Sequence, residues 1–201
     1  MSFVPRFPIS YFWKGKINNI SPLLEYCSDS KNLKEIKGET IGHIDWKGQC
    51  LIETYDFIDN SVLLKSLNNV FKNFGTEMLH ATSALDMDIE IKNSWLNVYH
   101  KNYYQETHNH IAPKSKYNHK TWSAVIFLNE GEGFSKFQFV NSLLSLRQDN
   151  LIKHVFEIEP KSSDVIIFPC ETLHQVTPHK SSEKRMTIAF NFVLETKYEH
   201  E

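Results

Sequence analysis

Two periods of apolar residues divide the sequence near residue 87. Before that point, residues 59–79 (DNSVLLKSLNNVFKNFGTEML) repeat apolar side chains every three or four positions, which predicts an amphipathic helix. Asp59, Asn60 or Ser61 is placed to cap its first turn. After that point apolar and polar residues alternate, and this period of two predicts β-strands.

The alternating part of the chain contains six short segments rich in Val, Ile, Phe and Tyr. Turn-forming stretches such as NEGEG and PKSSD separate them, and this spacing predicts an antiparallel sandwich or barrel. We therefore expect one domain over 1–201, mainly β with helices (α+β), with an N-terminal extension over 1–87 and a β core over 88–201. The predicted strands are 89–100, 121–129, 135–140, 154–160, 164–169 and 185–194.

Composition narrows the class of protein further. The 201 residues carry 22 basic and 24 acidic side chains, for a formal charge of −2, so no bulk charge favours nucleic acid or an anionic membrane. The three cysteines are far apart and form no C-x-x-C pair, which favours a reducing compartment. No segment has the apolar run of a signal peptide or a membrane span. We expect a cytoplasmic protein without a membrane or nucleic-acid partner.

The stretch QETHNH at residues 105–110 places two histidines one residue apart. In an extended segment residues i and i+2 point to the same side, so His108 and His110 would face one site. A metal would need a third ligand, and His174 is the best candidate because it follows the apolar strand VIIFP and a tight corner. His179 and His119 are competing third ligands. The alternative to a metal site is a polar loop that is rich in histidine and binds no metal.

The strand that begins at Arg185 carries two different faces. Alternation puts Arg185, Thr187, Ala189 and Asn191 on one face, and Met, Ile and Phe residues on the other. An arginine on the inner side of a sheet is costly without an anion, and its planar fork suits a carboxylate. The alternative is an arginine at the sheet rim that pairs with a nearby glutamate.

Four stretches together resemble the iron(II)- and 2-oxoglutarate-dependent oxygenases. They are SWLNVYHKNYYQETHNH, TWSAVIFLN, DVIIFPCETLHQVTPH and KRMTIAFNF, in the order that the family shows, and they cover about half the chain over 94–193. The chain is most similar to the small, prolyl-hydroxylase-like branch found in bacteria and their phages. This resemblance implies a double-stranded β-helix, the cupin-like jelly roll, and a cytoplasmic location, including that of a host cell when a phage encodes the protein.

The resemblance also assigns roles around a cosubstrate. Arg185 matches the residue that binds the far carboxylate of 2-oxoglutarate, with Thr187 as its hydroxyl helper. Tyr99 and Asn97 share a strand face and are expected to reach the cosubstrate. Asn191 lies on the pocket face of the arginine strand and is expected to contact the cosubstrate as well. From the predicted strand 121–129, either Trp122 or Ser123 is expected to line the pocket.

The metal ligands match the family at two positions and depart from it at a third. His108 matches the first iron ligand and His174 the distal one, but His110 stands where the usual triad has Asp or Glu. Three imidazoles leave the site one negative charge short, which weakens Fe(II) binding and lets Zn(II), Cu(II) or Ni(II) compete. Glu106, also two residues from His108, is a second candidate for the missing carboxylate.

The function implied is an Fe(II)- and 2-oxoglutarate-dependent dioxygenase that hydroxylates an unactivated C–H bond. The branch of the family points to a peptidyl prolyl or another amino-acid side chain, so the implied partners are the small-molecule cosubstrate and a protein or peptide substrate. The alternative is a cupin-like metal-binding protein that kept the jelly roll without 2-oxoglutarate turnover. Binding of 2-oxoglutarate and its dependence on Arg185 distinguish the two.

Overall fold

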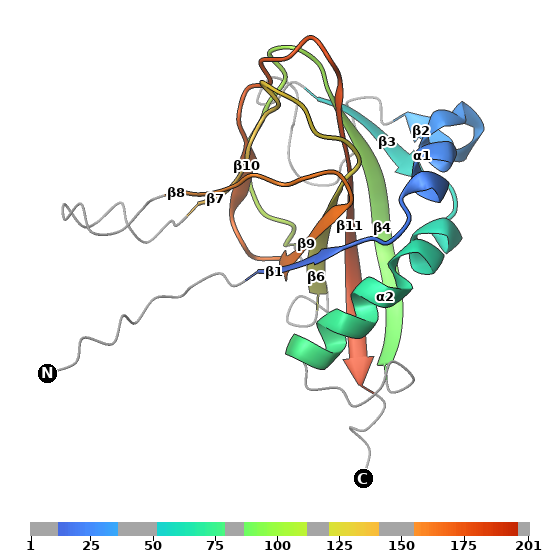
Figure 1. The fold of residues 1–201 in the computed structure, drawn as a ribbon. Coiled ribbons are helices and arrows are strands. Elements are labelled where there is room, and N and C mark those ends of the chain that lie inside the picture. The colour runs from blue at the N-terminus through green and yellow to red at the C-terminus, as the bar shows by residue number, and fades with distance from the viewer. Residues whose placement is uncertain (1–11, 36–51, 79–86, 112–120, 141–154, 197–201) are drawn as a thin grey trace, which may run out of the picture.

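The computed structural model describes residues 12–35, 52–78, 87–111, 121–140 and 155–196 (Figure 1). The described chain is built from two antiparallel sheets and a few helical segments. The helical segments are α1 (Ser21–Ser28), the 3-10 turn η1 (Ser30–Asn32) and α2 (Ser61–Met78). None of these described helices is long and apolar enough to cross a lipid bilayer.

The larger sheet has seven strands in the order β1-β9-β6-β11-β4-β3-β2. Its strands are β1 (Trp13–Lys16), β2 (Leu33–Glu35), β3 (Glu53–Phe57), β4 (Met87–Tyr99), β6 (Thr121–Phe127), β9 (Asp164–Pro169) and β11 (Arg185–Thr196). The three strands that come from the first 87 residues extend this sheet at both edges, because β1 pairs with β9 and β3 with β4. The N-terminal extension is thus built into the same sheet as the core.

The smaller sheet has four strands in the order β5-β10-β7-β8. They are β5 (Gln105–His108), β7 (Phe137–Val140), β8 (Val155–Ile158) and β10 (His174–Val176). One cluster of buried side chains, which includes Phe127, Phe137 and Phe168, joins the inner faces of the two sheets. The smaller sheet therefore covers one face of the larger one.

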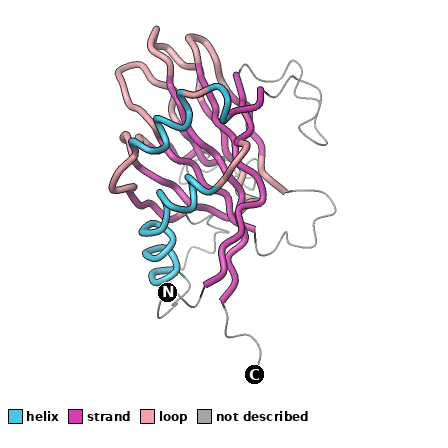
Figure 2. Tube along the Cα trace, turned by 90° about the vertical axis from the view of Figure 1, so that its right-hand side faces the viewer, coloured by secondary structure: helices cyan, strands magenta, loops and turns pink. Residues whose placement is uncertain are grey.

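Helices cover the opposite face of the larger sheet. Figure 2, which views this side, shows α1 and α2 in front of the strands. A second core cluster fills this layer, where Phe71 and Phe74 of α2 meet Phe190 and Phe192 of β11. The result is three layers: the helices pack on one face of the larger sheet, and the smaller sheet packs on its other face.

Helix α2 forms where the apolar spacing predicts it. The Asp59 carboxylate accepts hydrogen bonds from the backbone N–H and the hydroxyl of Ser61, at 2.8 and 2.6 Å, which satisfies a free donor of the first turn. Leu63, Leu67 and Phe74 are fully buried along one side. The helix thus holds its apolar stripe against the larger sheet.

The six predicted strand segments are confirmed as β4, β6, β7, β8, β9 and β11. The predicted class, mainly β with helices and antiparallel strands, is confirmed with them. On β11 the predicted alternation holds as well, since Ile188 and Phe190 face the helices while Ala189 faces the smaller sheet. This strand therefore contributes to both buried layers.

Replacing Phe74 by Ala tests the helix layer. Its ring lies 4.9 Å from Trp122, 5.8 Å from Trp13 and 6.3 Å from Phe192, measured between ring centroids. Loss of these contacts should lower the free energy of unfolding by about 3–5 kcal/mol, measured by urea denaturation. The exposed neighbour Asn73→Ala should stay within about 0.5 kcal/mol. Equal stability of the two variants would contradict the packing.

Candidate metal centre

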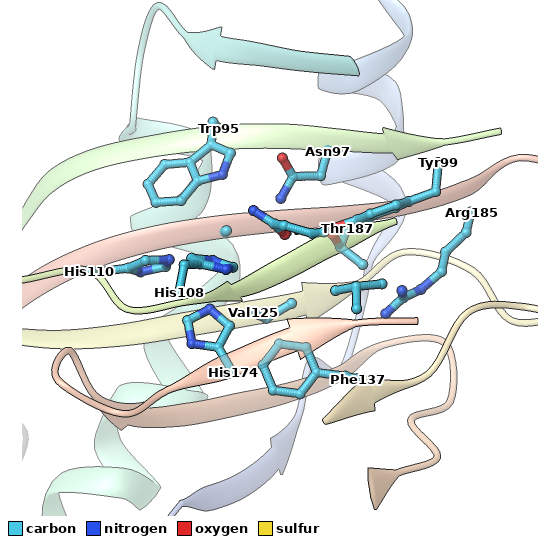
Figure 3. Close-up of a pocket in the computed structure, with 13 residues that line it drawn as sticks. Trp95, Asn97, Tyr99, His108, His110, Val125, Phe137, His174, Arg185 and Thr187 are labelled. Atoms are coloured by element: carbon cyan, nitrogen blue, oxygen red, sulfur yellow. Dashed lines mark hydrogen bonds between the residues drawn. The ribbon is translucent and has the colours of Figure 1, made fainter. Parts of the chain in front are cut away.

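Three histidine side chains meet at one end of a cavity between the two sheets (Figure 3). Strand β5 ends at His108, which lies opposite His174, the first residue of β10. His110 follows β5, and its backbone N–H donates to the carbonyl of Cys170 at 2.8 Å. One ring nitrogen of each histidine lies within 4.8 Å of the others. The fold thus brings together three residues that the sequence places up to 66 positions apart, from His108 to His174.

Hydrogen bonds to backbone carbonyls orient two of the imidazoles. Nδ1 of His108 lies 2.8 Å from the carbonyl oxygen of Glu106, and Nδ1 of His174 lies 2.9 Å from that of Thr172. A carbonyl oxygen only accepts, so each Nδ1 carries the proton and donates it. The lone pair is left on Nε2 of each ring, which is the arrangement found when a histidine binds a metal through Nε2.

Side chains orient the third imidazole. Nδ1 of His110 lies 2.9 Å from Oδ1 of Asn191 and 2.9 Å from Oγ of Ser123, and this hydroxyl donates to the same Oδ1 at 2.7 Å. With the amide oxygen as common acceptor, Nδ1 of His110 donates to it, and Nε2 again carries the lone pair. All three histidines therefore present an unprotonated nitrogen to the shared site.

The three imidazoles are held neutral. Desolvation, followed by the nearness of His108, lowers the pKa of His110 to about 3. Desolvation also lowers the pKa of His108, and it lowers that of His174 well below its ordinary value, with repulsion from the other two histidines as the next cause. The neutral ring is the form that binds metal, so the trio has no proton to lose before a divalent ion enters.

Two of the rival ligands, Glu106 and His179, lie outside the histidine trio. Within the described part of the chain no carboxylate joins the trio, and Glu106 is outside it. His179 uses both nitrogens, since Nδ1 accepts the N–H of Ser135 at 3.1 Å and Nε2 donates to the carbonyl of Glu183 at 2.6 Å. His119 lies outside the described residues. The geometry thus favours His174 over His179 and His110 over Glu106.

A buried cation occupies the other end of the cavity (Figure 3). Arg185 is 2% exposed, and its Nη1 donates to Oγ of Ser135 at 2.7 Å. Its guanidinium carbon lies 5.1 Å from the ring centroid of Tyr99 and 5.4 Å from that of Phe127. Burial lowers the pKa of Arg185 to about 10, so the group is still charged at neutral pH.

The guanidinium lacks an anionic partner. Among the residues that the structure describes, Nη2 of Arg185 is buried without a hydrogen-bond partner and no carboxylate pairs with the side chain. The alternative of a rim arginine paired with Glu183 or Glu171 is therefore wrong. A lone buried cation is costly, which indicates a site built to receive an anion.

Paired residues of β4 and β11 supply the polar side chains between the two ends of the cavity. In the β4–β11 ladder Arg185 lies opposite Tyr99, and Thr187 lies opposite Asn97, with all four residues facing the cavity. The hydroxyl of Tyr99 donates to Oε1 of Gln105 at 3.0 Å. Each of these two residue pairs thus adds polar groups to the cavity wall.

Two predicted pocket positions need correction, and a third is displaced. Trp122 does not line the cavity: its ring packs 4.9 Å from that of Phe74, on the helix side of the sheet. Asn191 does not line it either, because its amide is engaged with His110 and Ser123. Ser123, fully buried, lies behind His110 rather than on the wall. Adjacent strand residues point to opposite faces, so only one of Trp122 and Ser123 faces the smaller sheet, and the depth of that side chain depends on the layer that covers it.

Other lining residues were missed from the sequence. Trp95 stands opposite Ala189 on the same ladder, and its ring lies 5.4 Å from that of His110. Its place two residues before Asn97 would have indicated the cavity face. Phe137 comes from the smaller sheet and stacks on His174 at 5.3 Å. No local pattern distinguishes Phe137 from the other core aromatics.

The two ends of the cavity require different chemistry from a ligand. Three Nε2 lone pairs suit a divalent transition metal, and a guanidinium with an unused Nη2 suits a carboxylate. A molecule that spans the cavity would need a metal-chelating group at one end and a carboxylate at the other. 2-Oxoglutarate has both, so the residues present fit a metal and this cosubstrate.

Comparison with known proteins assigns the family. Residues 93–191, about half the chain, match a family model described as "Putative 2OG-Fe(II) oxygenase". The chain belongs to the 2-oxoglutarate- and Fe(II)-dependent oxygenases, and it is an enzyme of that class with Fe(II) as metal and 2-oxoglutarate as cosubstrate. No match is found among curated protein sequences.

Solved structures share the fold. A prolyl-4-hydroxylase from Pseudomonas putida has a TM-score of 0.58 at 13% identity, over 90% of this chain and 91% of that one. A viral collagen prolyl hydroxylase from Paramecium Bursaria Chlorella virus-1, in complex with 2-oxoglutarate, has a TM-score of 0.55 at 14% identity, over 91% and 96%. HygX from Streptomyces hygroscopicus, with nickel and 2-oxoglutarate bound, has a TM-score of 0.57 at 10% identity, over 90% and 82%. These likenesses confirm the predicted double-stranded β-helix.

The lone guanidinium makes a prediction about stability. Arg185→Met fills a similar volume without the buried charge, so the free energy of unfolding should stay level or rise by up to about 2 kcal/mol. Urea denaturation without added ligand measures it. Lys184→Met, at the exposed neighbour, should change it by less than about 0.5 kcal/mol. A loss above about 1 kcal/mol for Arg185→Met would mean that the arginine is a structural group.

Proposed function

We propose that this oxygenase hydroxylates an unactivated C–H bond of a peptidyl prolyl or another amino-acid side chain. The observation that carries the dioxygenase chemistry is the cavity with a histidine trio at one end and an unpartnered buried guanidinium at the other. For the substrate, support comes from the likeness to two prolyl hydroxylases, which is a likeness of fold.

In this proposal the metal is held by Nε2 of His108, His110 and His174. The three donors come from one side, since β5 and β10 are adjacent strands and His110 follows β5 directly. An ion held by these three residues would face the cavity, where a cosubstrate could reach it. The hydrogen bonds of each Nδ1 fix the ring planes, so the donors need little rearrangement when the ion enters.

The cosubstrate is oriented by the opposite end. Arg185 pairs with the carboxylate remote from the metal, and the hydroxyl of Thr187, two residues along the same strand, adds a donor. Tyr99 and Asn97, on the facing rungs of β4, complete the polar wall. The strand register therefore determines which end of the dicarboxylate points at the metal.

Bound Fe(II) and 2-oxoglutarate supply the activation of dioxygen and the oxidising equivalents for C–H cleavage. The protein's own contribution is position and exclusion of water. Apolar side chains from both sheets, Val125, Phe137, Val176 and Ala189, line the middle of the cavity. They keep the reacting centre dry and hold a C–H bond of the substrate near it.

The competing function is metal binding without 2-oxoglutarate turnover. A three-histidine site is compatible with either function, so the trio does not separate them. Arg185 does, because a metal-storage or structural site has no use for a buried cation that faces the same cavity. We further propose a cytoplasmic location, in keeping with the small number of cysteines and the absence of a C-x-x-C pair.

Removal of one histidine tests the ligand assignment. His174→Ala should lower the affinity for Mn(II), a stable substitute for Fe(II), by at least about 100-fold in calorimetry, because one of three donors is lost. His100→Ala removes an imidazole that instead contacts Glu53 at 2.8 Å, and it should bind Mn(II) like the wild type. Similar affinities for the two variants would exclude His174 as a ligand.

Removal of the guanidinium tests the oxygenase function. Arg185→Ala should bind Mn(II) at least as tightly as the wild type, because a positive charge is removed, but lose about 100-fold in 2-oxoglutarate affinity, the usual effect of removing one partner of a buried charge pair. Lys184→Ala is the matched control.

Turnover is then measured on the wild type. Anaerobic addition of Fe(II) and 2-oxoglutarate should give a weak visible charge-transfer band, and admission of oxygen should give succinate. Proline-containing peptides should gain one oxygen atom, detected by mass spectrometry. If Mn(II)-loaded protein does not bind 2-oxoglutarate, the oxygenase proposal fails and the metal-binding alternative stands.

A further inference from the structure

The ligand set proposed above carries no charge, and neither do the groups that accept its hydrogen bonds. The carboxylate of Glu106 acts on His108 through its charge, but it belongs neither to the trio nor to the cavity lining. His108 and His174 donate to backbone carbonyls, and His110 donates to an amide oxygen that also accepts from a hydroxyl. A carboxylate at any of these positions would bring negative charge to the ion. Among the described residues that line the cavity, none is Asp or Glu. Nothing in that wall offsets the charge of a divalent ion.

The other end of the cavity adds to the imbalance. Arg185 is buried and charged, and no described carboxylate pairs with it. With a divalent ion on the histidines, the described lining would hold three positive charges in a cavity whose remaining side chains are apolar or uncharged. Like charges in such surroundings repel more strongly than in water. An aspartate in place of His110 would remove one of these charges.

We infer that His110, neutral and held by Asn191 and Ser123, makes retention of the metal depend on a dianionic cosubstrate. This rests on the proposed function and concerns the same site. A dicarboxylate that spans the cavity places a negative charge at both positive ends, whereas a monoanion places one at only one end. His110 is thus a specificity-determining residue: it makes metal and dicarboxylate bind together and weakly when apart.

Linkage makes the inference measurable from either side. If 2-oxoglutarate raises the affinity for Mn(II) by some factor, then Mn(II) must raise the affinity for 2-oxoglutarate by the same factor. Chelation alone produces part of this factor in any such site. The contribution of His110 is therefore the difference between the wild type and a variant with a charged ligand at this position.

Two variants introduce a negative charge at position 110, and a third introduces the same charge outside the ligand set as a control. His110→Asp and His110→Glu place a carboxylate at two different distances from the backbone. Asn191 can accept either change, because a turned amide donates an N–H where its oxygen accepted before. Asn109→Asp adds the same charge one residue away, at a side chain whose Oδ1 accepts the N–H of Ile111 at 3.3 Å. It lies outside the trio and the cavity wall.

Calorimetry of Mn(II) binding, under anaerobic conditions, with and without saturating 2-oxoglutarate, gives the coupling factor for each protein. The wild type and Asn109→Asp should show a factor on the order of 100, near the upper range of such couplings. The better of His110→Asp and His110→Glu should bind Mn(II) more tightly than the wild type without cosubstrate, and its factor should fall to about 10 or less.

Pyruvate provides the charge comparison on the cosubstrate side. It has the same 2-oxo acid group as 2-oxoglutarate but no second carboxylate. In the wild type, saturating pyruvate should raise the Mn(II) affinity by less than a tenth of the factor seen with 2-oxoglutarate. An equal factor for the two acids would show that chelation alone provides the coupling, and the inference would be wrong.

The outcomes separate the two proposals. If 2-oxoglutarate does not bind the Mn(II)-loaded wild type, the proposed function fails and this inference with it. If it binds, but both carboxylate variants keep the wild-type coupling factor, only the inference is overturned. The same holds if both carboxylate variants bind Mn(II) less tightly than Asn109→Asp in the absence of 2-oxoglutarate.

Discussion

Strand β11 is the constraint on which both the core and the site depend. Ile188 and Phe190 face the helices, while Arg185 and Thr187 face the cavity, and the strand pairs with β4 on one side and β6 on the other. A slip by one residue would exchange the two faces, moving the guanidinium into the helix layer and apolar side chains into the cavity. Because both faces are buried, each layer enforces the register that the other needs.

The cavity concentrates unfavourable electrostatics that the rest of the fold must support. Neutral, desolvated imidazoles crowd at one end, and a cation without a counter-charge in the described structure lies at the other. Aromatic contacts with Tyr99 and Phe127 and one hydrogen bond to Ser135 offset part of the cost of burying Arg185. Sites of this kind trade stability for binding, and the trade is possible because two large apolar clusters flank the larger sheet.

His110 sets this chain apart from the usual pattern of its family. The departure extends behind the ligand, where an amide and a hydroxyl form a neutral support fitted to an imidazole. Replacing His110 by an acidic residue would therefore change the charge of the ligand set, while the amide and hydroxyl behind it stay uncharged. The negative charge that the protein does not supply has to come from what enters the cavity.

Much of this was readable in the linear pattern. Alternation located six strand segments, and the three- and four-residue spacing located α2. The H-x-H pair, with a distant histidine and an arginine strand, indicated the site. Strands β5 and β10, of four and three residues, lie in no longer alternating segment, and only the histidine motifs marked them.

Alternation also assigned each strand residue to a face, but it did not say which layer covers that face or how deep a side chain lies. Trp122 was therefore misplaced, and the link between His110 and Asn191, 81 residues apart, was not visible. These contacts arise from strand pairing and sheet stacking, and local periodicity contains no information about either.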